Sequence, residues 1–500
     1  MAVRAEIYKN TISIGFCQLL SIALSMFVPY LFISNYGSSL NGLLATLSQI
    51  FAYIGIIEFG LGAATQMSLL PYLAKDDKDG ISNILYISKA YYQKISIYYT
   101  IIYSSLAFIL PFIIKTEVNY WTIFFIVIIE GASGTINFLF LTFWKMLLIT
   151  DGKSHIIEKV NLIYKLFATV LKLILAYYSV NIIAIEVIYL FITVFTILIY
   201  RCYIKRFYSW IDIKNKVNPI NKLNGRLSYA INAIAGTVLN STDLVLLSII
   251  FNTAYSSVYA VYNMIYLALN QLLTSVYFGI SYILGKAYHK DINLYIKLHY
   301  AFETVFIMAI SALMSCCSVL MIPFVKIYTQ GITDIDYIYK YFPLLFGLTH
   351  ILTWDRYVSG YLLYVAGKAN VEARYSIVEA SINIFLSILL SITIGIYGLL
   401  IGTVIALSYK VVKMTYYANS IILNKSSFNS YKTIIINLAI YLLIEIFCHL
   451  CPLKIISLIE FFKVATVTFI LVTLIYFLIN LMFNYEIFKS ILTLKKIQLT

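Results

Sequence analysis

A chain of 500 residues that is 61% hydrophobic and only 12% charged has too few charged groups to coat a soluble body of its size. A formal net charge of +14 would suggest nucleic acid as the partner of a soluble protein. Here the basic residues lie on loops between long apolar stretches, where they would meet anionic lipid, so we expect a membrane protein and no nucleic-acid partner.

About fourteen apolar stretches follow one another along the chain, and each holds roughly the twenty residues that a helix needs to cross ~30 Å of hydrocarbon. We therefore predict an all-α polytopic membrane protein with about 14 transmembrane helices. The predicted spans are 11–34, 42–72, 95–114, 120–148, 157–178, 182–200, 228–251, 255–284, 300–324, 338–366, 375–394, 397–418, 432–450 and 460–483.

The basic residues alternate between the two sides of this predicted bundle. If the N-terminus is inside the cell, 29 of the 36 Lys and Arg residues fall on inner segments and 5 on outer ones, while Lys172 and Arg356 stay within the apolar layer. Cytoplasmic loops of membrane proteins carry such an excess, so both termini are predicted to be cytoplasmic. Arg4 and Lys9 precede the first span without an Ala-x-Ala site, so we expect that span to be retained.

The two halves of the chain resemble each other at a period of about 215 residues. Thr150-Asp151-Gly152-Lys153 corresponds to Val365-Ala366-Gly367-Lys368, and the turns near Tyr36 and Tyr255 match at a similar distance. Six spans in each half would make parallel repeats about a pseudo-two-fold axis along the membrane normal, as in alternating-access transporters. The predicted domains are an N-terminal six-helix lobe at 1–200, a basic cytoplasmic linker at 201–227, a C-terminal six-helix lobe at 228–420, and accessory helices 13 and 14 with a cytoplasmic tail at 421–500.

Polar side chains recur every three or four residues along the fifth span, at Glu158, Asn161, Lys165, Thr169 and Lys172. This spacing places them on one face of a helix. A charge inside the membrane usually faces a partner or a water-filled cavity, so the face could be the wall of an anion-binding cavity. The alternative is that both lysines extend to opposite membrane interfaces.

Arg356 lies beside Asp355 in the tenth span. A guanidinium can hold a phosphate through two parallel hydrogen bonds, which a lysine cannot reproduce. The alternative is a structural pair with Asp355 or with a carboxylate of another helix. The neighbouring Tyr357 could stack on a sugar ring, although aromatic belts and packing explain most tyrosines of such a chain.

Three acidic residues lie near the middle of predicted spans: Glu58, Glu130 and Asp243. They could couple transport to a proton or sodium gradient or pair with the cations above, or they could form ordinary interhelical hydrogen bonds. The glycines that follow Glu58, at positions 60 and 62, would let the second span bend or let a neighbouring helix approach.

Cys448-His449-Leu450-Cys451 has a spacing like that of a metal site, at the predicted outer end of span 13. Pro452 stands where a haem attachment would need His, so we expect ordinary membrane residues and no metal. No catalytic residue is predicted.

Several short segments resemble a known family. Asn35-Tyr36-Gly37, Asn41-Gly42-Leu43, Gln49-Ile50-Phe51 and the stretch 58–62 resemble spans 1 and 2 of Wzx-type polysaccharide flippases, which belong to the multidrug/oligosaccharidyl-lipid/polysaccharide exporter superfamily. The segment 148–153 resembles the turn that follows span 4 in that family. These strings cover a minor part of the chain, whereas the likeness in span number, repeat and loop length covers all of it.

The resemblance implies two six-helix lobes around a central cationic cavity that opens alternately to either side of the bacterial cytoplasmic (inner) membrane. The implied activity is the flipping of polyprenyl-pyrophosphate-linked oligosaccharide repeat units to the outer leaflet for surface polysaccharide (lipopolysaccharide or capsule) synthesis. Membrane lipids, glycosyltransferases and a polysaccharide polymerase are the implied partners, and no cofactor is implied. The candidate residues for pyrophosphate and sugar are Lys165, Lys172, Arg356, Asn161 and Tyr357.

Two other functions stay open at this point. A multidrug exporter of the same superfamily would be expected to have twelve spans and a cavity with acids and few basic residues. A membrane polysaccharide polymerase or ligase would need a substantial outer loop with Arg or His, and the loops 325–337 and 451–459 are short and poor in such groups. A transporter is therefore predicted in preference to an enzyme.

Overall fold

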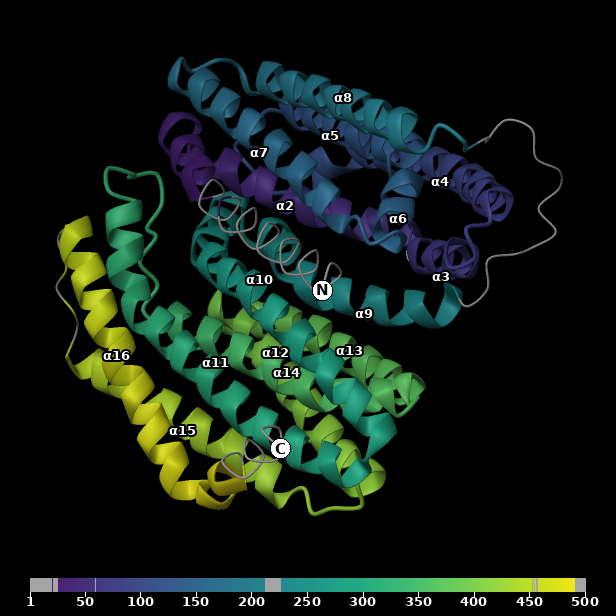
Figure 1. The fold of residues 1–500 in the computed structure, drawn as a ribbon. Helices are drawn as coiled ribbons and strands as arrows, with labels where there is room; N and C mark the ends of the chain where they lie inside the picture. Colours follow the sequence, from purple (N-terminus) through teal and green to yellow (C-terminus); the bar gives the residue numbers. More distant parts are fainter. Residues whose placement is uncertain are drawn as a thin grey trace. The chain divides into compact units, whose positions relative to one another are not determined.

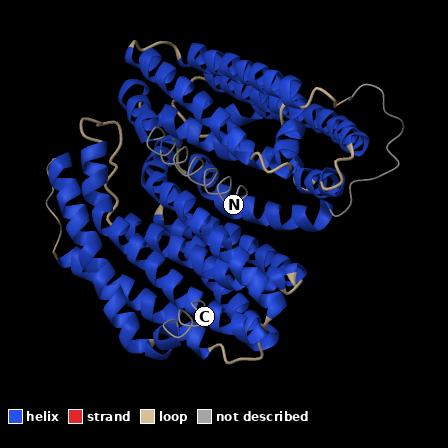
Figure 2. Ribbon diagram, viewed as in Figure 1, coloured by secondary structure: helices blue, strands red, loops and turns tan. Residues whose placement is uncertain are grey.

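The computed structural model describes residues 20, 26–58, 60–211, 226–451, 453, 455 and 457–490. Throughout these residues the regular elements are helices, with no strand (Figure 2). Eleven helices in the described part are long and apolar enough to cross a membrane. The predicted all-α, multi-pass membrane architecture is therefore confirmed.

Three predicted spans are not among those eleven helices, each for its own reason. The first span lies largely outside the described residues, although 26–36 are helical. The seventh corresponds to α9 (Arg226–Ile250), of which Ser241–Ile250 forms a shorter apolar helix. The tenth corresponds to α12 (Phe342–Val365), a 24-residue helix that is less apolar because it carries polar residues that include Asp355 and Arg356. Every predicted span from the second to the fourteenth thus coincides with a helical segment.

The chain forms two compact units, Met1–Ser257 and Val258–Thr500. The first unit (Figure 1) contains α2 (Ser38–Ile54), η1 (Gly55–Glu58), α3 (Leu61–Leu73), α4 (Lys78–Ile113), α5 (Tyr120–Phe140), α6 (Thr142–Thr150), α7 (Ser154–Tyr177), α8 (Ile182–Phe207), α9 and the first turn of α10 (Thr253–Lys290). The predicted lobe boundaries stay a prediction, and residues 212–225 of the predicted linker lie outside the described part.

The second and fourth spans of the first unit are broken helices. Gly60 has φ +85°, a left-handed conformation that favours glycine, and it starts α3 in a new direction after η1. The bend predicted after Glu58 is thereby confirmed. The break at Leu141, between α5 and α6, has no glycine or proline beside it and was not predicted.

Small and hydroxyl residues bring α2 against α9 and the start of α10. A Cβ on Gly42 would lie 1.6 Å from the carbonyl oxygen of Thr253, so no other residue fits there without a shift of the backbone. Asn41 donates to Ser257 Oγ at 2.7 Å, and the hydroxyls of Thr46 and Ser248 are 2.5 Å apart. Close approach through a glycine, with hydrogen bonds across the contact, is the usual way in which helices associate within a membrane.

The second unit comprises most of α10, α11 (Ile292–Tyr328), α12, α13 (Ala369–Ile394), α14 (Tyr397–Tyr416) with its π-helical extension η2 (Tyr417–Ile422), α15 (Phe428–Leu450) and α16 (Leu458–Phe483). α13 and α14 form a close hairpin, because a Cβ on Gly398 or Gly402 would meet the α13 backbone within 2.2 and 2.7 Å. The accessory helices α15 and α16 both pack on α11 (Figure 1).

Tyrosines of α10 lie inside the second unit, where they hold α10 to α12. Tyr262 and Tyr266 are fully buried, and their hydroxyls donate to the carbonyl oxygens of Tyr337 and Pro343. Their rings stack on Phe346, and that of Tyr266 also stacks on His350. Buried aromatic rings that each find an acceptor add specific geometry to apolar packing.

The turn that suggested the internal repeat occurs twice with the same hydrogen bonds. The backbone amides of Asp151, Gly152 and Lys153 donate to the carbonyls of residues 147, 149 and 148, and those of Ala366, Gly367 and Lys368 donate to 362, 364 and 363. The two glycines have φ +72° and +71°. The same αL glycine therefore ends a helix and starts the next one at equivalent places in the two halves.

Replacing Gly152 or Gly367 with alanine should lower the free energy of unfolding by about 1–2 kcal/mol, the usual cost of a left-handed backbone for an L residue. An added Cβ meets no atom within 4 Å at either site, so backbone strain is the cause. Gly55→Ala is the matched control, because Gly55 has φ −59° and open space around it. Thermal unfolding of the purified protein in detergent would measure the effect, and three equally stable variants would contradict it.

Candidate functional site

Lys172 is paired within the first unit. Its Nζ lies 3.2 Å from Glu186 Oε1, which α8 supplies, and 4.2 Å from the centre of the Tyr189 ring. Lys172 is half-buried and Glu186 is buried. The lysine thus shares the interior of the α7–α8 hairpin with a carboxylate and an aromatic face, as a cation within an apolar layer requires.

Glu130 of α5 belongs to the same neighbourhood, since it interacts electrostatically with both Lys172 and Glu186. This group therefore contains two carboxylates and one ammonium. Glu186 is not among the candidate acids named from the sequence. Its position one turn after the start of span 6 was the available signal.

The remaining residues of the predicted α7 face have different surroundings. Lys165 is half-buried and has no ion pair in the described part of the chain, whereas Asn161 is exposed. Thr169 is buried among helices. The face predicted from the spacing therefore includes one paired cation, one unpaired cation and one exposed amide.

Glu58 and Asp243 make contacts between helices of the first unit. Tyr92 of α4 donates to Glu58 Oε1 at 3.1 Å, and Lys145 of α6 interacts with Glu58 electrostatically. Asp243 is buried in α9 close to Tyr53 of α2. Both acids thus lie where neighbouring helices meet.

Arg356 lies in a buried three-residue network of the second unit. Its guanidinium donates to Glu379 Oε1 of α13 at 2.6 Å, and Lys410 Nζ of α14 donates to the other carboxylate oxygen at 2.9 Å. Lys410 also donates to Ser376 Oγ at 2.9 Å. One carboxylate therefore pairs with two cations, three helices converge on it, and Glu372 of α13 interacts electrostatically with both cations. Lys410 counts among the inner basic residues in the sequence, at the inner half of the predicted span 397–418, and only the fold shows that it is buried.

The partner of Arg356 is thus a carboxylate of another helix and not Asp355. Asp355 is 1% exposed, and neither of its oxygens accepts a hydrogen bond from the described residues. Its electrostatic neighbour is Glu303 of α11, which accepts from Ser430 Oγ at 2.6 Å. Tyr357, by contrast, is 41% exposed, and the Arg356 guanidinium lies 5.3 Å from its ring centre.

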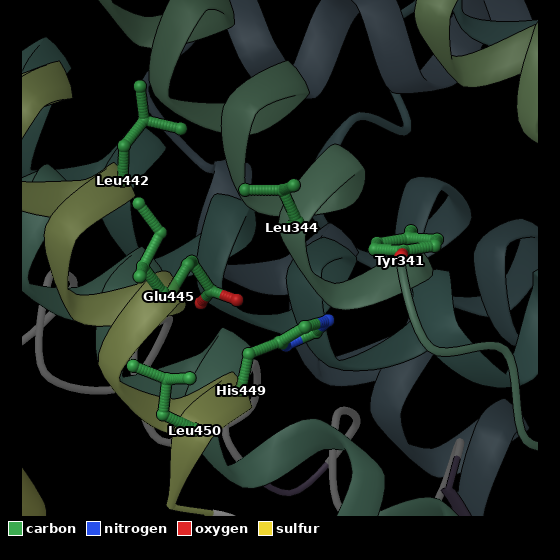
Figure 3. Close-up of a pocket in the computed structure, with 7 residues that line it drawn as sticks. Tyr341, Leu344, Leu442, Glu445, His449 and Leu450 are labelled. Carbon is green, nitrogen blue, oxygen red and sulfur yellow. The ribbon is translucent and has the colours of Figure 1, made fainter.

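A pocket of about 270 Å³ lies between α12 and α15, beside the Cys448–Cys451 segment. Figure 3 shows Glu445 and His449 of α15 directed toward Leu344 and Tyr341. The His449 and Tyr341 rings are stacked at 5.5 Å, and Glu445 Oε1 accepts no hydrogen bond from the described residues. Within the described part of the chain, no three His, Cys, Asp or Glu residues are grouped closely enough to hold a metal ion.

A polar network closes the turn between α6 and α7. Lys153 Nζ lies 2.8 Å from Asp151 Oδ2 and donates to the hydroxyl of Tyr208, which itself donates to Asp151. Burial lowers the pKa of Lys153, but the hydrogen bonds and charges of Asp151 and Tyr208 outweigh it and hold the pKa above its ordinary value. Burial, followed by the bond to Asp151, raises the pKa of Tyr208 to about 12. The end of α8 is therefore tied to a charged turn at neutral pH.

No protein-family model matches the sequence, and no curated protein matches it. Several solved structures do match this chain. An inward-facing multidrug resistance transporter of the MATE family, within the MOP superfamily, matches with a TM-score of 0.64 at 13% identity and covers 82% of this chain and 97% of its own. Lipid II flippase MurJ in its inward closed conformation matches with a TM-score of 0.66 at 13% identity, over 95% of this chain and 100% of its own.

A MOP superfamily transporter from Pyrococcus furiosus Vc1 also matches, with a TM-score of 0.56 at 12% identity over 84% of this chain and 97% of its own. The chain folds like a MOP superfamily transporter. The superfamily fold expected from the resemblance is thereby confirmed. The solved structures that this chain resembles are transporters and a flippase. The Wzx-type assignment within the MOP superfamily stays a prediction.

The Arg356–Glu379–Lys410 network predicts that Glu379→Gln and Lys410→Met differ in how much they lower the stability of the protein. Glu379→Gln would leave two buried cations facing each other and should cost about 3–5 kcal/mol of stability, as for a broken buried ion pair. Lys410→Met should cost much less, because Arg356 and Glu379 still neutralise each other. Thermal unfolding of both variants, purified in the same detergent, would check this order. A Lys410→Met variant as unstable as Glu379→Gln would contradict it.

Proposed function

We propose that this protein flips polyprenyl-pyrophosphate-linked oligosaccharides from the cytoplasmic to the outer leaflet of the bacterial cytoplasmic membrane by alternating access. The observation that carries the proposal is the presence of cations inside the helices, one of which has no ion pair among the described residues. Arg356 and Lys410 share one carboxylate, and Lys165 has no ion pair among the described residues. Such positive charge favours an anionic group in a low-dielectric surrounding.

The chemistry of the substrate fits these side chains. A pyrophosphate is the part of a lipid-linked sugar that is costliest to take into an apolar layer. A guanidinium recognises phosphate oxygens through parallel hydrogen bonds, and a lysine acts as a mobile point charge. A phosphate that approaches Arg356 would compete with Glu379, which Lys410 can continue to neutralise. Asn161 and Tyr357 are exposed and are proposed to contact the sugars.

The comparisons favour a flippase over a drug exporter. The lipid II flippase covers 95% of this chain, whereas the multidrug transporter covers 82%. The flippase therefore resembles more of this chain than the drug exporter does. Glu58, Glu130 and Asp243 remain candidates for coupling to a proton or sodium gradient, and a polymerase and glycosyltransferases remain proposed partners.

Lys165→Gln provides the sharpest test, because it removes a cation without breaking an ion pair. Lys159→Gln on the same helix is the matched control, since Lys159 is exposed. In proteoliposomes with a fluorescent polyprenyl-pyrophosphate oligosaccharide, the initial flipping rate should fall about tenfold or more in Lys165→Gln, equivalent to at least ~1.4 kcal/mol, and stay unchanged in Lys159→Gln. Equal rates in the two variants would contradict a role for Lys165.

The same vesicles can separate the flippase from the multidrug exporter. An imposed proton or sodium gradient should drive no accumulation of a cationic dye, because the buried cations would repel it. Dye transport without movement of the lipid-linked oligosaccharide would overturn the proposed substrate.

A further inference from the structure

The first unit contains a crevice of about 670 Å³ to which the proposed transport cycle assigns no part. Helices α4, α5, α6 and α8 form it. Its lining is mostly aliphatic and aromatic, and it consists of Lys89, Gln93, Ile136, Leu139, Phe140, Phe143, Trp144, Val194, Ile197, Tyr200 and Arg201.

The charged residues of the crevice have one sign, since two cations line it and no acidic residue does. Lys89 is half-buried and Arg201 is exposed, and neither forms an ion pair within the described part of the chain. Tyr200 is 1% exposed, and its hydroxyl has no hydrogen-bond partner among the described residues. A buried hydroxyl without a partner costs free energy, and the two cations without ion pairs are the charges that the crevice offers to an occupant.

The crevice lies toward one end of the helices that form it. The Lys78 ammonium, at the start of α4, lies 5.7 Å from the centre of the Trp210 ring, which follows α8. Tyr208 ties the same end of α8 to the turn at Asp151 and Lys153. These are the basic loops that the charge distribution assigns to the cytoplasm, so Lys89 and Arg201 lie at the level of the inner leaflet.

We propose that this crevice binds an anionic phospholipid of the inner leaflet. The phosphate lies between Lys89 and Arg201, and one acyl chain lies along Ile136, Phe140 and Val194. Basic pockets between transmembrane helices on the cytoplasmic side recognise lipid head groups in this way. The apolar lining is what selects a lipid over a free phosphate.

Trp144 lines the crevice and can report on the occupant. The protein is reconstituted in phosphatidylcholine that contains either phosphatidylglycerol or phosphatidylcholine with brominated chains, and bromine quenches nearby tryptophan. The Trp144 signal is the quenching that is lost in Trp144→Phe. We expect phosphatidylglycerol to bind about fivefold to tenfold more tightly than phosphatidylcholine, since two cations contribute to its attraction.

The preference for phosphatidylglycerol should disappear in Lys89→Gln/Arg201→Gln and persist in Lys94→Gln/Lys205→Gln. The second pair removes the same charge from exposed positions on the same two helices that do not line the crevice. If the first pair fails to fold, Lys89→Arg/Arg201→Lys should keep the preference. Equal quenching by both lipids in the parent protein, or equal loss in both charge-removing variants, would overturn the proposal. Flipping of the lipid-linked oligosaccharide is measured in a separate assay. A failure of the lipid-binding proposal can therefore be told apart from a failure of the proposed flippase activity.

Discussion

A cation inside a hydrocarbon layer needs an opposite charge, and the tertiary arrangement of both units depends on meeting that need. Lys172 and Glu186 join α7 to α8, and Glu379 joins Arg356 of α12 to Lys410 of α14. Without these pairs each charge would be buried in an apolar surrounding that cannot solvate it. The packing of these helices and the pairing of their charges therefore depend on each other.

The ion pairs would not suffice without close packing around them. Gly42, Gly398 and Gly402 let helices approach until their backbones nearly touch. The buried Tyr262 and Tyr266 of α10 add hydrogen bonds to the carbonyl oxygens of Tyr337 and Pro343, at and before the start of α12. In a membrane, where water does not drive helices together, such packing and hydrogen bonding supply most of the association energy.

Lys172 and Arg356 could be found from the sequence, but their carboxylate partners could not be named from it. Lys172 and Arg356 stand out in the sequence because a charge within an apolar span is costly and usually faces a partner or a water-filled cavity. Asp355 or another helix's carboxylate was the expected partner of Arg356, and only the second alternative is right. Glu186 and Lys410 escaped notice because both lie near predicted span ends, where a charge needs no explanation. The cations inside the helices are nevertheless the feature on which the proposed pyrophosphate substrate rests.

The sequence by itself determined the membrane class, a helical segment at each predicted span from the second onward and the repeated turn at Gly152 and Gly367. These features depend on residues close together in the chain: about twenty apolar residues for a span, and one glycine for a left-handed turn. Only the tertiary structure decided which charges meet and which helices break without glycine. Those outcomes depend on which face each helix turns to its neighbours, and that is set by contacts between residues far apart in the sequence.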